Sequence, residues 1–347
     1  MWRPLGVLLP ALLLSIYSVQ PAQAETEISV IGNVGVTTQS KKVERPYWTE
    51  KLSERSKGSI KANFRAREEM GLKGPELVRL LQDGVTQFAS VFLGAVSGEN
   101  AINDAMDLAG QSPSLAELEK TISAFAPVMA QEYEKKYGIK ILAYHSFPAQ
   151  MLFCKDEVRG LEDLKGRNIR SSGASQGDLL KYFGANPIAM SYTEVQQALQ
   201  KGVVDCAITS AIGGYSAKWY EAAGYLFTLP INWAVSLTAV NIDAWNKLDA
   251  STRQTISANV AEMRDAMWAL NREEGEIGIS CNTGGNCPLG PAGKMTRVDA
   301  SARDAALLAE ALPKAVLPNW AKRCGDDCVA AFNETVGKVT GLTAKMP

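Results

Sequence analysis

The chain has 347 residues, of which 46% are hydrophobic and 21% are charged, and its formal net charge at pH 7 is −1. This balance excludes the marked lysine and arginine excess of a nucleic-acid-binding protein, and no polybasic segment for a lipid headgroup is present. One hydrophobic core rarely supports a chain of this length, so we expect two domains.

The first 24 residues have the pattern of a secretory signal peptide. Arg3 supplies a positive start, residues 5–16 form a short apolar run, and Ala22-Gln23-Ala24 is a small-x-small cleavage site. The alternative is a membrane anchor, but the apolar run is shorter than the roughly 18 residues that such an anchor needs. We therefore expect a signal peptide over 1–24 and a mature protein that is exported and soluble.

Strands and helices alternate along the first part of the mature chain. Periodicity and turn residues predict strands over 27–31, 60–65, 85–92 and 139–146, and helices over 43–55, 74–82 and 116–137. The strand over 85–92 is largely apolar, as expected for a buried parallel strand. Asn33 lies in the turn after the first strand and Phe92 ends the third, and both are candidate ligand contacts.

Residues 164–205 predict a second α/β unit. A short strand carries Arg170, a helix ends at Gly184, a second strand carries Pro187, and a further helix ends at Gly202 before the apolar strand 203–208. This order is typical of right-handed crossover units on a parallel sheet.

Arg170 is the strongest candidate for ligand binding. Ligands of parallel sheets meet the loops at the carboxyl ends of the strands, where Arg170, Thr209 and Ser210 are expected. A guanidinium holds a carboxylate through two parallel hydrogen bonds, and the small residues that follow Arg170 leave room for a ligand. The alternative is a surface arginine paired with Asp163 or Glu162.

The C-terminal part predicts a strand over 233–241, a helix around Trp245 and one long helix from Ser251 to about Gly278. The long helix contains no proline, and we expect it to cross between the domains. Helices around Ala305 and Val329 are expected to pack on the second domain.

Six cysteines in an exported chain favour disulfides. Two pairs flank short turn-rich segments, NTGGN and GDD, and two further cysteines lie at predicted strand ends, where they can pair across neighbouring strands. The local pairs are Cys281 with Cys287 and Cys324 with Cys328, and the strand-end cysteines are Cys154 and Cys206. A four-thiolate zinc site is the alternative for the two local pairs.

Groups for catalysis are scarce. No nucleophile elbow, Walker loop or dinucleotide fingerprint is present. The single histidine, His145, lies in an apolar run and is expected to be a satisfied strand-end residue rather than a catalytic base. We expect neither an enzyme nor a bound metal or cofactor.

Aromatic residues gather around the second unit. Tyr215, Trp219 and Tyr220 follow the strand 203–208, and Trp233 begins the next predicted strand, 233–241. Most aromatic side chains lie in cores. We expect Tyr215, Trp233 and Phe92 to line a pocket between the domains, where ligand sites preferentially occur.

Three consecutive motifs, DLKGRNIR, FGANPIAM and EVQQALQKGVVD, resemble the solute-binding subunits of tripartite ATP-independent periplasmic (TRAP) transporters. The likeness extends to the signal peptide, the Met70-Gly71 turn and the segment 240–245, and it covers nearly the whole mature chain. The resemblance implies an α/β, two-lobed periplasmic binding protein fold, with a cleft between the domains and a long domain-spanning helix. We expect domain I over 25–146 plus 234–272, and domain II over 147–233 plus 273–347.

The resemblance also implies the site. Arg170 matches the family's carboxylate-binding arginine, and Thr209 stands where many members place an asparagine. Gln150 lies nearest the place where many members carry a second arginine, and no arginine is available there. With Phe92 in place of the polar groups of sugar-acid binders, we expect a monocarboxylate with an apolar or aromatic body.

The implied partners are this small carboxylate and the small and large TRAP membrane subunits, and the protein is expected to be a monomer. Two other functions stay open from the sequence. One is a periplasmic ligand sensor with the same fold, and the other is an exported enzyme acting on a carboxylic acid.

Overall fold

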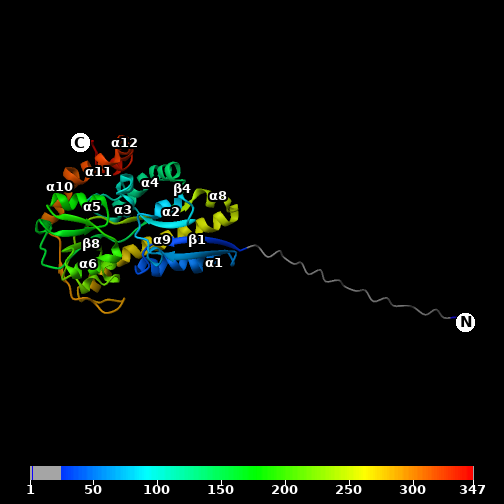
Figure 1. The fold of residues 1–347 in the computed structure, drawn as a ribbon, viewed down its shortest axis with the longest axis horizontal. Coiled ribbons are helices and arrows are strands. Elements are labelled where there is room, and N and C mark those ends of the chain that lie inside the picture. The colour runs from blue at the N-terminus through cyan, green and yellow to red at the C-terminus, as the bar shows by residue number, and fades with distance from the viewer. Residues whose placement is uncertain (1, 3–24, 347) are drawn as a thin grey trace.

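The computed structural model describes Trp2 and residues 25–346. Apart from Trp2, the predicted signal peptide over 1–24 lies outside the described residues. The described chain forms two α/β lobes, each built on a mixed sheet (Figure 1). No helix in the described part of the chain is long and apolar enough to cross a membrane.

The first lobe contains a five-stranded sheet of order β2-β1-β3-β10-β4. Strand β1 is parallel to both β2 and β3, whereas β10 is antiparallel to β3 and β4. The strands are β1 (Thr26–Gly32), β2 (Ile60–Ala66), β3 (Phe88–Phe92), β4 (Ile139–Ser146) and β10 (Val235–Asn241). The helices are α1 (Leu52–Arg55), α2 (Leu77–Gln82), α3 (Leu93–Val96), α4 (Leu115–Tyr137) and α8 (Ile242–Lys247), with π-helical turns at Ser40–Glu44 and Tyr47–Lys51 and 3-10 turns at Arg67–Met70 and Ala101–Asp104.

The second lobe contains a six-stranded sheet of order β11-β9-β5-β8-β6-β7. The strands are β5 (Gln150–Cys154), β6 (Asn168–Ser171), β7 (Asn186–Ala189), β8 (Cys206–Ser210), β9 (Tyr225–Phe227) and β11 (Thr296–Val298). The helices are α5 (Ala174–Tyr182), α6 (Val195–Lys201) and α7 (Ala211–Ser216), with 3-10 turns at Leu161–Leu164, Tyr192–Glu194 and Trp219–Glu221. Strand β6 is parallel to β7 and β8, which confirms the predicted crossover units.

Three segments of the chain link the lobes. The stretches 146–150 and 227–235 connect strands of the two sheets, and α9 (Ala250–Asn282) packs on β4 of the first lobe and on α7 of the second. The predicted domain-crossing helix is therefore confirmed, and it extends four residues past Gly278. Gly278 lies where α9 meets α7, and a Cβ added there would lie 2.7 Å from the Ala211 carbonyl carbon.

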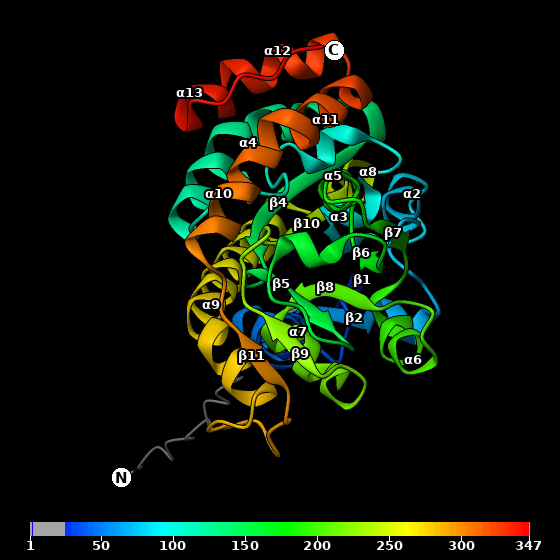
Figure 2. The ribbon, with the colours of Figure 1, turned by 90° about the vertical axis from the view of Figure 1, so that its left-hand side faces the viewer.

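The C-terminal helices contact both lobes. They are α10 (Ala302–Ala311), a π-helical segment Leu312–Val316, α11 (Leu317–Cys324), α12 (Asp326–Glu334) and α13 (Val336–Thr340). Helix α13 lies against α4, as Figure 2 shows, and the indole Nε1 of Trp320 donates to the Ala101 carbonyl at 2.7 Å. On the other side, Arg323 pairs with Asp178 of α5 at 2.6 Å. The tail therefore joins the lobes, whereas the sequence predicts packing on the second domain alone; the domain boundaries themselves stay a prediction.

All six cysteines form the disulfides that the sequence favours. The pairs are Cys154–Cys206, Cys281–Cys287 and Cys324–Cys328. No group of metal-ligating side chains is found among the described residues. With these thiols in disulfides, the four-thiolate zinc alternative is not supported.

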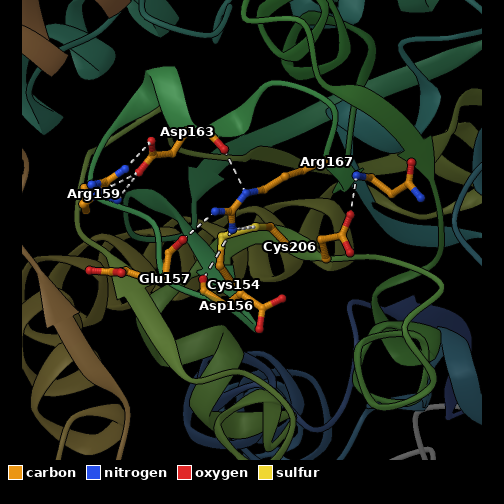
Figure 3. Close-up of a disulfide and its surroundings, with 9 residues drawn as sticks. Cys154, Asp156, Glu157, Arg159, Asp163, Arg167 and Cys206 are labelled. Carbon is orange, nitrogen blue, oxygen red and sulfur yellow. Dashed lines mark hydrogen bonds and ion pairs between the residues drawn. A yellow bond between two sulfur atoms is a disulfide. The ribbon is translucent and has the colours of Figure 1, made fainter.

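The Cys154–Cys206 disulfide joins β5 and β8 at directly opposed positions. Beside it, the Arg167 guanidinium donates to the carbonyl of Asp163 at 2.8 Å and to that of Glu157, as Figure 3 shows. This arginine ties the loop before β6 to the end of β5, at the edge of the sheet away from Arg170.

Candidate functional site

A cavity of about 70 Å³ lies between the lobes. Residues of the first lobe and of the linking segments line one side, namely Asn33, Val34, Thr37, Arg67, Phe92, Phe147 and Ala234. Residues of the second lobe line the other, namely Gln150, Arg170, Ser172, Tyr192, Thr209, Ser210 and Gly213. The volume is far below the roughly 300–1,000 Å³ of a site for a drug-sized molecule, so the cavity suits a compact ligand.

The topology explains why these side chains meet. Asn33 and Arg67 follow β1 and β2, and Phe92 ends β3, so all three lie at the carboxyl ends of parallel strands. Arg170 and Thr209 lie near the carboxyl ends of the parallel strands β6 and β8. The two sheets therefore present their ligand-binding edges to each other across the cleft.

A wider groove of about 650 Å³ adjoins the cavity and shares with it Arg67, Phe92, Arg170, Ser172 and Tyr192. The groove continues between the lobes, so it offers a path by which a ligand reaches the cavity.

Arg170 is buried, with 5% of its surface exposed, and the protein backbone holds its guanidinium in place. Nε donates to the Met190 carbonyl at 3.1 Å, and Nη1 donates to the Ile208 carbonyl at 2.6 Å. The Trp219 ring lies beneath, with its centroid 5.9 Å from the guanidinium carbon. These contacts fix the side chain without using all of its five N–H donors.

The Arg170 charge has no acidic partner among the described residues. Asp163 pairs with Arg159 and Glu162 pairs with Arg303, so the alternative of a surface arginine paired with either acid is wrong. Burial lowers the pKa of Arg170 to about 10, and the nearby Arg67 charge acts in the same direction. The guanidinium is still protonated at pH 7, and a buried cation in this position is stabilised by an anion.

Arg67 is a second buried arginine in the cavity wall, with 7% of its surface exposed. Its Nη1 atom is buried and has no hydrogen-bond partner in the described part of the chain. The cavity wall therefore holds a second arginine besides Arg170. The strand leading into the second domain lacks an arginine, as expected from the sequence, but Arg67 reaches the cavity from the turn after β2 of the first lobe.

Polar side chains surround the two arginines. Thr209 and Ser210 end β8, and the Ser210 oxygen accepts a hydrogen bond from the Gly213 amide at 3.1 Å, which caps α7. The Gln150 side-chain amide donates to the Pro148 carbonyl at 2.8 Å. The Asn33 amide nitrogen lies 3.4 Å from His145 Nε2. Each of these groups keeps further hydrogen-bonding capacity toward the cavity.

Apolar groups complete the wall. Phe92 and Phe147 contribute rings, and Val34 and Ala234 contribute smaller side chains. The lining holds two arginines and no acidic residue. An enclosed site of this composition favours a small anion with a partly apolar body.

Six of the eight side chains predicted to bind ligand line the cavity, and their role in binding stays a prediction. They are Arg170, Thr209, Ser210, Gln150, Phe92 and Asn33. The other two, Tyr215 and Trp233, do not line it. The Tyr215 ring stacks on Tyr220, with centroids 5.3 Å apart, and its hydroxyl donates to the Pro291 carbonyl.

Trp233 is held away from the cavity by the first lobe. Its indole Nε1 donates to the Ser112 carbonyl at 2.8 Å, and its backbone amide donates to Asp107 at 3.0 Å. Asp107 also accepts from the amide of Ala234 at 2.7 Å. A buried carboxylate of the first lobe thus fixes the linking segment beside the cavity, and Ala234, rather than Trp233, faces the ligand space.

His145 is buried in β4 and does not line the cavity. Burial lowers its pKa to about 3, so the ring is neutral at pH 7. Its Nδ1 atom has no hydrogen-bond partner among the described residues, so the expectation of a fully satisfied histidine is wrong. Because the ring does not reach the cavity, it is not placed to take a proton from a ligand there.

Sequence reasoning missed Arg67, Tyr192, Phe147 and five smaller contributors. The five are Val34, Thr37, Ser172, Gly213 and Ala234. Arg67 and Tyr192 follow the parallel strands β2 and β7. The rule that ligands bind at the carboxyl ends of parallel strands, which identified Arg170, therefore identifies them as well. Tyr192 donates its hydroxyl to the Gly213 carbonyl at 2.5 Å and packs against Trp219.

The fold and site have counterparts among known proteins. Residues 34–280 match the family described as bacterial extracellular solute-binding protein, family 7 (DctP). The chain is 25% identical over 334 residues to the C4-dicarboxylate-binding periplasmic protein DctP of Rhodobacter capsulatus, covering 95% of this chain and 97% of that protein. It is 28% identical over 180 residues to the uncharacterized protein YiiZ of Salmonella typhimurium, covering 51% of this chain and 54% of YiiZ.

Among solved structures, one similar fold is DctP7 of Bordetella pertussis, an extracytoplasmic solute receptor binding pyroglutamic acid. The TM-score is 0.79 at 23% identity, and the match covers 89% of this chain and 99% of that chain. At this identity the likeness concerns the two-lobed fold.

Proposed function

We propose, on the premise that this chain belongs to family 7 of the bacterial extracellular solute-binding proteins, that it captures a small organic acid in the periplasm and delivers it to a TRAP membrane permease. The resemblance that the sequence motifs carry is confirmed, and so is the two-lobed α/β fold. The expectation of a binding protein rather than an enzyme is confirmed by the family.

One observation supports the proposed ligand class above the others: Arg170 is a buried, protonated guanidinium without an acidic partner in a cavity that has no acidic lining. A carboxylate neutralises this charge and accepts two parallel hydrogen bonds from a guanidinium. The backbone carbonyls of Met190 and Ile208 already orient the side chain, so little ordering is needed when the ligand binds.

The remaining walls favour a compact monocarboxylate with a partly apolar body. Phe92, Phe147 and Val34 offer apolar surface, and the hydroxyl groups of the lining belong to Thr37, Ser172, Tyr192, Thr209 and Ser210. A ligand with many hydroxyls would leave some of them without partners against the apolar wall. Pyroglutamic acid, which DctP7 binds, has a single carboxyl group on a small ring, and we take it as the first ligand to test.

Binding proceeds without chemical change. The ligand's carboxylate docks on Arg170 in the second lobe, and the first lobe closes on it by motion at the three linking segments. Closure removes water from the cavity and strengthens the ion pair. The ligand shifts the population toward the closed form by the difference between its affinities for the two forms. The closed receptor, a monomer, then meets the membrane subunits.

A thermal-shift screen of small carboxylic acids tests this function. A ligand that binds only the native state raises the free energy of unfolding by about 2.7 kcal/mol when its free concentration is a hundred times its Kd. We expect monocarboxylates to raise the unfolding temperature of the wild type and of Arg159→Gln, in which an exposed arginine is removed from the same lobe. Arg170→Gln should show no such rise. A rise that persists in Arg170→Gln, or none with any acid, contradicts the proposal.

A further inference from the structure

Arg67 is a buried cation whose hydrogen-bonding capacity the protein leaves unused. The side chain is 93% buried by surface, since 7% remains exposed, and Nη1 has no partner in the described part of the chain. Buried guanidinium groups are ordinarily satisfied, because an unsatisfied donor of a charged group costs several kcal/mol. Since Arg67 also lines the cavity, a ligand atom is the natural acceptor for it.

The backbone around Arg67 is shaped to admit its guanidinium. Gly74 has a φ of +122°, and a Cβ added there would lie 2.8 Å from Nη1. Any residue other than glycine would therefore push the guanidinium out of its position. The absence of a side chain at Gly74 thus leaves room for this guanidinium beside the loop before α2.

Arg67 and Arg170 approach the cavity from opposite lobes. Arg67 begins the 3-10 turn after β2 of the first sheet, and Arg170 lies in β6 of the second. A ligand held by Arg170 therefore lies in the cavity whose other side Arg67 lines.

The charges around the two arginines differ. The carboxylates of Glu68 and Glu44 act on Arg67 through space and partly balance its charge, and neither forms a close ion pair with it. No carboxylate acts on Arg170 in the same way, and the Tyr192 hydroxyl is the one acidic group that does. The ligand therefore needs one negative charge, beside Arg170. The N–H groups of Arg67 can donate to a ligand oxygen that carries no charge.

We propose that Arg67 binds an uncharged carbonyl oxygen of the ligand, so that the substrate class is a compact monocarboxylate with a carbonyl or amide oxygen opposite its carboxyl group. This inference rests on the proposed function and deepens it, because it assigns the specificity for that second oxygen to the first lobe. Closure is then most favourable for acids that satisfy both arginines at once.

Isothermal titration calorimetry with matched acids tests the assignment. The pairs are 4-oxopentanoate against pentanoate and pyroglutamate against cyclopentanecarboxylate, with pentanedioate as the diacid. In the wild type we expect each carbonyl-bearing acid to bind about tenfold or more tightly than its partner, as a charge-assisted hydrogen bond predicts. Pentanedioate should bind less tightly than 4-oxopentanoate.

Variants assign this preference to Arg67. Arg67→Met should reduce the preference to less than threefold while the affinity for the carbonyl-free acids changes little. Arg65→Met, which removes an exposed arginine two residues earlier, should keep the preference. Arg67→Lys keeps the charge without the planar guanidinium, so it should retain part of the preference for carbonyl-bearing acids. This variant replaces Arg67→Met in the test if Arg67→Met does not fold.

Three results would overturn the inference. They are an equal affinity within each pair, a preference that survives in Arg67→Met, and a preference for pentanedioate that depends on Arg67. Failure of the proposed function looks different. In that case the acids either fail to bind the wild type or bind equally well to Arg170→Gln, whereas failure of this inference alone leaves Arg170-dependent binding intact.

Discussion

Replacement of Gly278 by alanine should destabilise the protein, because α9 and α7 approach each other most closely at this residue. A Cβ added at Gly278 would lie 2.7 Å from the Ala211 carbonyl carbon and 2.8 Å from Ile212 Cα. Both are backbone atoms of α7, so no side-chain rotation relieves the contact and the two helices must separate. Insertion of a methyl group into a packed core typically costs about 1–3 kcal/mol.

The magnitude follows from two opposed effects. Alanine favours a helix interior over glycine by about 1 kcal/mol, which offsets part of the steric cost. We expect Gly278→Ala to lower the free energy of unfolding by up to about 2 kcal/mol. Gly275 supplies the matched control, since it lies one turn earlier on α9 and a Cβ there meets no atom within 4 Å. Gly275→Ala should therefore raise the free energy of unfolding by about 0.5–1 kcal/mol.

Urea unfolding followed by circular dichroism, at one pH and temperature, measures both variants. The changes in unfolding free energy relative to the wild type should have opposite signs, and the two variants should differ by up to about 3 kcal/mol. Equal effects of the two substitutions would refute the inference that α9 and α7 are in backbone contact at Gly278. Because α7 begins beside the cavity, Gly278→Ala should also weaken ligand binding, and Gly275→Ala should not.

Two further predictions concern buried groups that do not line the cavity. Burial raises the pKa of Glu44 from 4.5 to about 7, so over this interval the folded protein holds a proton that the unfolded chain releases. The unfolding free energy of the wild type relative to Glu44→Gln should therefore fall as the pH rises from 4.5 to 7, by at most about 1.4 kcal/mol per pH unit. A difference in unfolding free energy that stays constant over this pH range would contradict the prediction. The Cys154–Cys206 disulfide spans 52 residues, and its removal by the double alanine substitution should cost about 4 kcal/mol in guanidinium unfolding. An unchanged midpoint would show that this bond does not constrain the unfolded chain.

The second lobe could be predicted from local patterns. The glycine stops at Gly184 and Gly202 lie at the ends of α5 and α6, and the parallel pairing of β6 with its neighbours follows from the crossover order. Once these strands are placed, the end of β6 puts Arg170 at the ligand edge of the sheet. The strand β8 extends two residues further than predicted and includes Thr209 and Ser210.

The other half of the site depends on contacts that local patterns do not encode. Arg67 reaches the cavity only because the first sheet faces the second across the cleft, and this arrangement is set by the linking segments and α9. The misplacement of Trp233 has the same origin. Its direction is decided by Asp107 and Ser112, residues more than a hundred positions away in the chain. Aromatic composition alone does not distinguish a pocket wall from such a contact.

The most direct test of the central claim is the affinity of one acid for the wild type and for Arg170→Gln, measured by titration calorimetry. The acid is the one that stabilises the wild type most in the thermal screen. Loss of the guanidinium from a buried ion pair should weaken binding by about 2–5 kcal/mol, or roughly thirtyfold or more. An affinity that is unchanged by Arg170→Gln would contradict the claim that this arginine holds the carboxylate.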